Sequence, residues 1–109
     1  YVDGDIEEKA DFFGRRIFEG KIVNNLNKRV DYVFIEFTLF NNKNDIIEKV
    51  KSYVSGITLT FKDSTISSSS IEQGKTANFK CSTSVPAESI TKYKYDIQWK
   101  VFHELPEKY

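Results

Sequence analysis

The chain has 109 residues, which is enough for one domain and too few for two. Its 39% hydrophobic and 15% aromatic residues can form a true core, which excludes an intrinsically disordered chain. Sixteen basic and sixteen acidic residues give a formal net charge of zero. The chain therefore lacks the positive excess by which proteins bind nucleic acid or anionic membrane surfaces, and we expect neither partner.

No stretch approaches the roughly 18 consecutive apolar residues of a membrane-spanning helix, and no basic-then-apolar signal opens the chain. We expect no direct membrane insertion by these residues. The chain starts with Tyr1 and contains no methionine, so we expect a piece of a longer protein whose signal peptide or anchor lies elsewhere. Its single cysteine, Cys81, cannot form an intramolecular disulfide, so the core alone must stabilise the fold.

The first dozen residues are acidic, and residues 1–16 as a whole allow three interpretations. Ile6, Ala10 and Phe13 are spaced by four and three residues, as on one face of a short amphipathic helix. An isolated helix of this length is only marginally stable in water, so a linker or an edge segment of a sheet is the alternative.

From residue 17 the hydrophobic pattern changes to the period of two that is typical of strands. Residues 17–23 predict a strand that ends at an asparagine-rich turn over residues 24–27. Residues 30–40 predict the central strand, because one of its faces is an unbroken row of β-branched, aromatic and aliphatic residues. A turn at residues 41–45 then reverses the chain into a strand over residues 46–54.

The opposite face of the central strand carries three aromatic residues, Tyr32, Phe34 and Phe40. Monomeric proteins seldom leave such a patch bare. Either Phe12, Phe13 or a neighbouring strand covers it, or it is a binding surface. These three aromatic residues are the candidate contacts with a partner.

Residues 57–61 alternate again and predict a further strand. Residues 62–70 include four consecutive serines, a composition that predicts a surface loop with no place in the core. The next strand covers residues 77–83, points Cys81 inward and is ended by Pro86. A last strand is expected over residues 93–102. Its apolar side carries Tyr95, Ile97, Trp99 and Val101.

Short strands separated by turns, with no spacing for crossover helices, are typical of all-β proteins. We predict an antiparallel two-sheet immunoglobulin-like sandwich of about six to seven strands. Alternating apolar positions account for its interior, so we expect no buried polar cluster. The predicted core comprises Val33, Ile35, Phe37, Leu39, Phe79, Ile97 and Trp99.

Residues 37–41, Phe-Thr-Leu-Phe-Asn, resemble the Phe-x-Leu-Tyr-Asp signature of the FxLYD domain family. Residues 20–24 resemble that family's Gly-x-aliphatic-x-Asn segment, and residues 71–75 resemble the turn before its next strand. The resemblance covers residues 17–102. It implies a non-catalytic β-sandwich module that is commonly attached to bacterial or archaeal cell-envelope proteins, including lipoproteins, and it implies no cofactor.

The predicted domain organisation has three parts. Residues 1–16 are a linker, short helix or edge segment, residues 17–103 are the FxLYD-like sandwich, and residues 104–109 are a C-terminal tail. We expect an accessory or interaction domain of a larger extracytoplasmic protein, whose partner is another protein or a neighbouring domain. The alternative is a carbohydrate- or peptide-binding module that uses exposed aromatic residues.

Residues that support catalysis or metal binding are scarce. His103 is the only histidine and Cys81 the only cysteine, and nothing in the sequence pairs them as base and nucleophile. One histidine and one cysteine cannot supply a zinc site. The asparagine-rich turns at residues 24–27 and 41–45 contain oxygen donors for calcium, but asparagine is foremost a turn former. We predict no enzymatic activity, no metal and no cofactor.

Overall fold

The computed structural model describes residues 1–61 and 63–101. These residues form eight strands and one short 3₁₀ turn, Ala87–Ser89. The strands are β1 (Glu7–Ala10), β2 (Arg15–Val23), β3 (Asp31–Phe40), β4 (Ile46–Tyr53), β5 (Ile57–Thr60), β6 (Ile66–Ser70), β7 (Thr76–Pro86) and β8 (Lys92–Lys100). Within the described ranges, no helix is long and apolar enough to cross a membrane.

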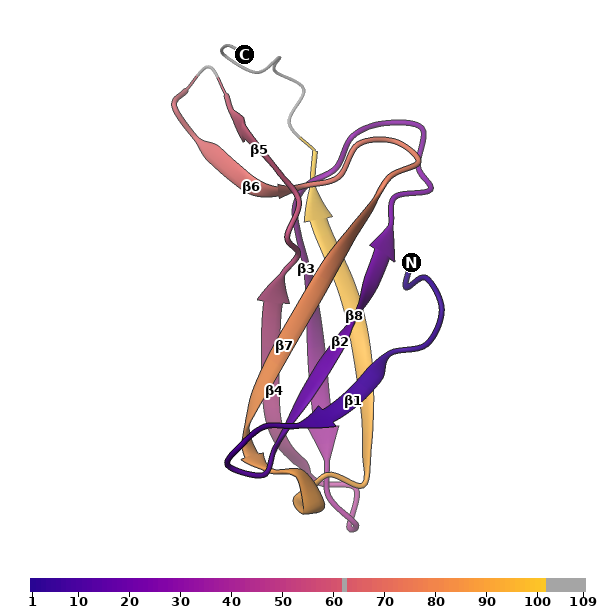
Figure 1. The fold of residues 1–109 in the computed structure, drawn as a ribbon, viewed down its shortest axis with the longest axis vertical. Coiled ribbons are helices and arrows are strands. Elements are labelled where there is room, and N and C mark those ends of the chain that lie inside the picture. The colour runs from indigo at the N-terminus through magenta and orange to yellow at the C-terminus, as the bar shows by residue number, and fades with distance from the viewer. Residues whose placement is uncertain (62, 102–109) are drawn as a thin grey trace.

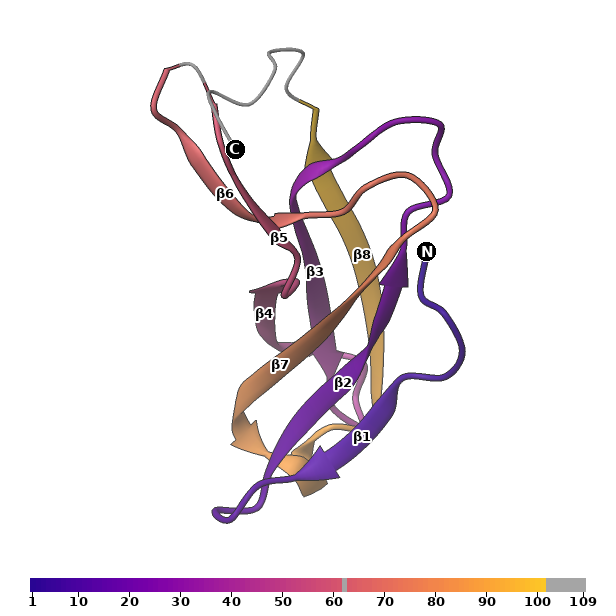
Figure 2. The same ribbon diagram turned by 45° about the horizontal axis from the view of Figure 1, so that its top comes forward.

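The strands form two antiparallel layers and an additional hairpin. One sheet has the order β1-β2-β7 and the other the order β4-β3-β8, while β5 pairs with β6. Figure 1 shows the first sheet in front of the second, and Figure 2 shows the same two layers after a tilt. At one side Ser55, just after β4, bridges to Asn78 of β7 and so connects the two sheets. The predicted all-β antiparallel sandwich is confirmed.

The central strand β3 is paired on both of its edges, and its residues alternate strictly between buried and half-buried. The buried face meets the opposite sheet through aromatic contacts. The Phe37 ring stacks on the Phe18 ring with 4.3 Å between centroids, and lies 6.1 Å from the Phe79 ring. The predicted core residues that are buried are Val33, Ile35, Phe37, Leu39 and Phe79.

The prediction that Trp99 belongs to the core is wrong. Ile97 is half-buried against the core, but Trp99 and Tyr95 are each 46% exposed. The reason is that β8 is the outermost strand of its sheet, where the opposite layer covers side chains less completely. Alternation correctly assigned these residues to one side of β8, but it could not show that this side lies at an open edge.

Of the three interpretations of the N-terminal segment, the edge strand is correct and the helix is wrong. β1 pairs antiparallel with β2, from Glu7 opposite Glu19 to Ala10 opposite Arg16. Further towards the N-terminus, Val2 forms an isolated bridge with Ile22. All four residues of β1 are exposed, so hydrogen bonding to β2 rather than burial stabilises this strand.

The prediction that the serine-rich segment is a surface loop is also wrong. β6 contains all four serines and pairs with β5, and three of them are buried: Ser67, Ser69 and Ser70. Small hydroxyl side chains can be buried when they are hydrogen-bonded. The Oγ atoms of Ser67 and Ser70 form such a hydrogen bond with each other, 2.9 Å long. The backbone at Gly56 also lies very close to the end of β6, because a Cβ at Gly56 would be only 2.3 Å from the Ser70 carbonyl oxygen. Only glycine fits at this position.

A buried charged cluster attaches the β5–β6 hairpin to β3, which contradicts the expected absence of buried polar groups. Asp31 is fully buried, and its Oδ1 accepts a hydrogen bond of 2.6 Å from the Ser70 hydroxyl. Arg29 donates to the same carboxylate from Nε at 2.9 Å and from Nη2 at 3.3 Å. The Arg29 guanidinium also lies 5.3 Å from the centroid of the buried Phe61 ring.

We predict that Asp31→Ala lowers the free energy of unfolding by about 3 kcal/mol, because it leaves the Arg29 charge and the Ser70 hydroxyl without this partner. Chemical denaturation of the two purified proteins measures the difference. Asp45→Ala, at an exposed turn position, is the control and should stay within about 0.5 kcal/mol of the parent. Equal effects of the two substitutions would contradict the assigned role of the cluster.

Candidate functional site

The outer face of the β4-β3-β8 sheet gathers aromatic and lysine side chains from three strands. The register places Phe34 opposite Tyr53 of β4, and Phe40 opposite Lys92 of β8. Residues two apart along each strand share this face. We call it the lysine–aromatic face. It comprises Tyr32, Phe34, Phe40, Tyr53, Lys49, Lys51, Lys92, Lys94 and Lys100.

Lysine ammonium groups lie over the rings of this face. The distances from Nζ to the ring centroid are 5.0 Å for Lys51 and Phe34, 5.8 Å for Lys51 and Tyr53, 5.1 Å for Lys92 and Phe40, 5.8 Å for Lys94 and Phe40, and 5.9 Å for Lys100 and Tyr32. All are within the range of cation–π attraction. Lysine stems therefore cover part of the aromatic surface while the charges remain in solvent.

The lysine–aromatic face is positively charged although the chain as a whole is neutral. All five of its lysines are exposed, and none takes part in a salt bridge among the described residues. Two carboxylates share the face, Glu36 and Asp96, which the register places opposite each other. Five lysines against two carboxylates leave an excess of three positive charges.

Tyr32 has an unusual backbone at the junction between this face and the β5–β6 hairpin. Its φ of 50° lies in the left-handed region, at the irregularity in the pairing of β3 with β8 between Asp31 and Phe34. Two contacts with β6 hold the residue. Its amide donates to the Ser67 Oγ at 3.3 Å, and its hydroxyl donates to the Ile66 carbonyl oxygen at 2.8 Å. Hydrogen bonds thus offset the cost of this conformation.

Two shallow hollows adjoin Tyr32. The first, of about 230 Å³, is lined by Tyr32, Phe34, Tyr53, Gln98, Trp99 and Lys100. The second, of about 240 Å³, is lined by Tyr32, Tyr53, Val54, Ser68 and Ser69. Both contain the tyrosines of two neighbouring strands, so aromatic surface is available there beside polar side chains.

The structure brings all three predicted contact residues onto one face, and each is half-buried. Phe12 and Phe13, one of the two predicted covers for that face, are 96% and 76% exposed and do not cover it. The side chains that contact these three aromatic residues are instead lysines and Tyr53, whose ring centroid is 5.4 Å from that of Phe34.

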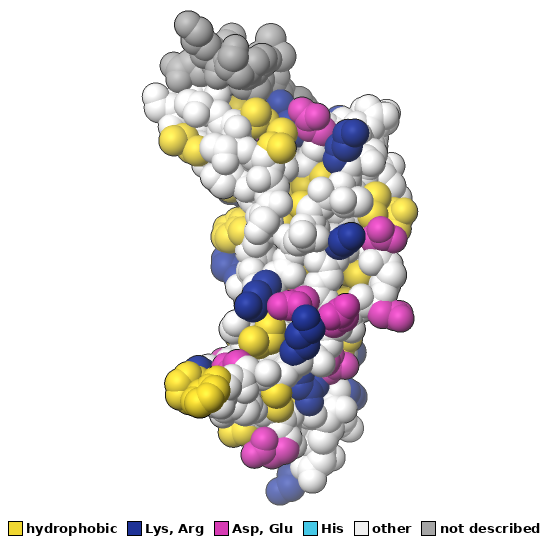
Figure 3. Space-filling view, viewed as in Figure 1, with side chains coloured by type: hydrophobic (Ala, Val, Ile, Leu, Met, Phe, Trp, Pro, Cys, Tyr) yellow, Lys and Arg dark blue, Asp and Glu magenta, His cyan; other side chains and the backbone are white. Residues whose placement is uncertain are grey.

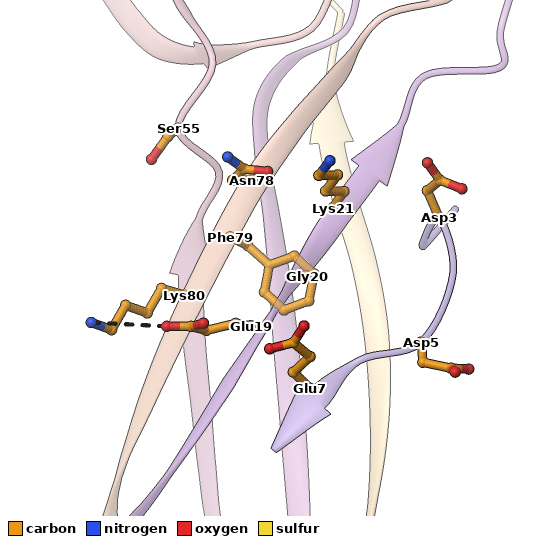
Figure 4. A pocket seen from close by; sticks show the side chains of 10 residues that line it. All are labelled: Asp3, Asp5, Glu7, Glu19, Gly20, Lys21, Ser55, Asn78, Phe79 and Lys80. Atoms are coloured by element: carbon orange, nitrogen blue, oxygen red, sulfur yellow. Dashed lines mark ion pairs between the residues drawn. The ribbon is translucent and has the colours of Figure 1, made fainter. Parts of the chain in front are cut away.

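A further surface depression, of about 550 Å³, lies on the opposite sheet and is lined by charged side chains of both signs (Figure 4). Glu7 and Glu19 are bridged by Lys9, whose Nζ lies 3.3 Å and 2.8 Å from their carboxylates. The hydrogen bond from Lys9 lowers the pKa of Glu19, and the same bond raises the pKa of Lys9. No group of three or more His, Cys, Asp or Glu among residues 1–61 and 63–101 is arranged to hold a metal ion.

The thiol of Cys81 is inward-facing, as predicted, and is 1% exposed. Burial, with a smaller contribution from the Glu48 carboxylate, raises its pKa to about 11. Such a thiol is almost entirely protonated near neutral pH and is a poor nucleophile. His103, considered with it as a catalytic pair, lies outside the described residues.

The asparagine side chains of the two turns bind backbone groups. Asn24 is buried, its Nδ2 donates to the carbonyl oxygens of Lys28 and Ile71 at 2.8 Å each, and its Oδ1 accepts from the Leu26 amide. In the other turn the Asn41 Oδ1 accepts the amides of Lys43 and Asp45 at 2.9 Å and 3.0 Å. These oxygens are used to form turns, as their composition indicated.

Sequence reasoning had missed part of the lysine–aromatic face. It identified the rings of β3, but it did not combine the lysines of β4 with those of β8. Lys92, Lys94 and Lys100 are at alternate positions of the last strand, and this pattern indicated that they share one side of it. Only the sheet order β4-β3-β8 shows that these lysines and Lys51 flank the same rings.

Comparison with known proteins does not assign the chain to a family. No family model, no curated protein and no solved structure matches it.

We predict that Cys81 reacts roughly 100 times more slowly with iodoacetamide at pH 8 in the native protein than in denaturant, on thiolate content alone. The reason is the rise of its pKa from 9.0 to about 11, and burial slows the reaction further. Mass spectrometry over time measures the labelling. Comparable rates in the two states would show that β7 does not point this residue inward.

Proposed function

We propose that this chain is a non-catalytic interaction module of a larger prokaryotic protein, located outside the cytoplasm and anchored by sequence beyond these residues. The support is the resemblance of residues 20–24, 37–41 and 71–75 to the FxLYD family, together with the antiparallel sandwich. In this proposal the sandwich is immunoglobulin-like, and its surface rather than its interior carries the function.

The contact surface in this proposal is the lysine–aromatic face. The single observation that supports it best is a group of five exposed lysines, four of which lie over aromatic rings, on a chain whose net charge is zero. Such a face fits a partner protein or neighbouring domain that presents carboxylates around an apolar centre. Stacked nucleic acid bases fit it less well, because lysines already lie over the ring faces on which bases would stack.

A second candidate is a carbohydrate- or peptide-binding module. The hollow of about 230 Å³ between Tyr32, Phe34 and Tyr53 favours it, because sugar rings and planar side chains pack on aromatic surfaces. Gln98 and Lys100 supply hydrogen-bond donors at the same hollow.

A random-peptide display library tests the first candidate, with the purified domain as bait. We expect the selected peptides to be enriched in Asp and Glu, and we expect their affinity for the domain to fall as the salt concentration rises. When a selected peptide is added, the NMR chemical shifts of backbone amides in β3, β4 and β8 should change. The variant Lys51→Glu/Lys94→Glu should reduce the affinity at least about tenfold, because it places like charges in the contact.

Lys21→Glu/Lys75→Glu is the matched control, since it reverses two exposed charges away from the lysine–aromatic face and should leave the affinity unchanged. Equal weakening by the two variants, or peptides without acidic enrichment, would rule out this contact surface. Binding on a glycan array that is lost with Tyr53→Ala would instead establish the second candidate.

A further inference from the structure

The turn between β1 and β2 exposes two adjacent phenylalanines. Phe12 is 96% and Phe13 76% exposed, and their rings form an edge-to-face pair with centroids 5.5 Å apart. We call Phe12 and Phe13 the phenylalanine tip. Figure 1 places the turn at the end of the molecule away from the β5–β6 hairpin, and in Figure 3 hydrophobic side chains protrude at that end.

The backbone of this turn is held in one conformation. The Asp11 Oδ1 accepts hydrogen bonds of 2.8 Å from the amides of Phe13 and Arg15, and its Oδ2 accepts one of 3.1 Å from the Arg15 Nε. Gly14 has a φ of 80°, its amide donates to the Asp11 carbonyl oxygen, and its own carbonyl oxygen accepts the Ala87 amide. A turn fixed in this way loses little conformational entropy when the rings become buried elsewhere.

The exposed rings are too small an area for a stable protein interface by themselves. Two phenylalanine side chains bury roughly 300–500 Å², whereas a stable interface needs about 800 Å² from each partner. A bilayer surface requires no matching area, because its headgroups and chains close around whatever apolar group enters. The convex shape of the tip and its small area therefore favour a lipid surface over a second protein.

The charges next to the tip show which lipids it fits. Arg15 pairs with Asp11, Arg16 with Glu8, and Lys9 with both Glu7 and Glu19. These cations are therefore already neutralised by the protein, and the attraction of anionic headgroups for them is weak. Insertion at this site depends on apolar area instead, so a zwitterionic lipid is sufficient.

We propose that the phenylalanine tip is a membrane-contact site that inserts the rings of Phe12 and Phe13 into the interface of a phospholipid bilayer. The rings enter the boundary between headgroups and chains and the rest of the sandwich remains in water. The sequence predicted no insertion, since no apolar segment is long enough to span a bilayer, but a two-residue tip needs no such segment. The proposal is independent of the lysine–aromatic face, which lies on the other sheet.

The expected binding is weak and reversible. A single myristoyl chain has a membrane association constant of about 10⁴ M⁻¹, and two phenylalanine rings bury no more apolar surface than such a chain. We therefore expect half-binding at roughly 0.1 mM accessible lipid or above. Burial of one phenylalanine side chain increases the constant for partitioning into the bilayer by roughly tenfold to 100-fold.

Flotation with phosphatidylcholine vesicles tests the proposal on the whole chain. The parent should float with the vesicles at millimolar lipid, and Phe12→Ser/Phe13→Ser should bind at least about 100-fold more weakly with an unchanged melting temperature. Ile66→Ser is the matched control, because it removes another exposed apolar side chain, 58% exposed on β6, and should not alter binding. In the Lys51→Glu/Lys94→Glu background, which removes the positive excess of the lysine–aromatic face, adding phosphatidylserine or raising the salt should change the affinity less than about threefold, since the charges next to the tip are paired.

A fluorescence measurement provides a second readout. In Phe13→Trp/Trp99→Phe the chain's one tryptophan lies at the tip, and its emission should shift to shorter wavelength on addition of vesicles. Absence of flotation at several times the expected lipid concentration would overturn the proposal. So would equal binding by the serine variant, or lipid-free self-association that this variant abolishes, which would identify a second copy as the occupant.

Discussion

Strand β3 is hydrogen-bonded on both edges, so each of its side chains must lie on one of two faces with different surroundings. On one face, the stacking of Phe37 against Phe18 joins the two sheets of the sandwich. The other face carries Tyr32, Phe34 and Phe40 under a layer of lysines. The core and the candidate contact surface are thus two sides of one strand, and a shift of register by one residue would exchange them.

A polar interaction stabilises the part of the fold that this apolar packing does not reach, the β5–β6 hairpin. The β5–β6 hairpin extends beyond the end of the two sheets (Figure 1), and four consecutive serines offer it little apolar area. The buried Asp31 carboxylate attaches it through Ser70 and Arg29. The same hairpin contacts Tyr32 and holds its left-handed backbone, so a structural cluster positions a residue of the candidate surface.

The two proposed contact sites rely on different physics. The lysine–aromatic face combines uncompensated positive charge with rings that are already half-covered, which suits a partner that is both acidic and apolar. At the phenylalanine tip the neighbouring charges are compensated by ion pairs, and the exposed surface is mainly apolar, with the Arg15 guanidinium 5.1 Å from the centroid of the Phe13 ring. The first proposed contact is expected to weaken with salt and the second is not, so salt should separate the two in solution.

The sequence by itself determined the fold class, the strand over residues 30–40 and the inward side of Cys81, because a period of two depends only on local backbone geometry. It did not determine the burial of Trp99, the structure of the serine-rich segment or the partners of Lys92 and Lys94. Those depend on which strands are neighbours and which lie at an edge, and sheet order is a property of contacts between residues distant in the chain. Composition predicted a loop for the serine-rich segment, but Ser70 is buried with a hydrogen bond to Asp31 and Ser67 is buried with a hydrogen bond to Ser70, and only the tertiary structure brings Asp31 to these serines.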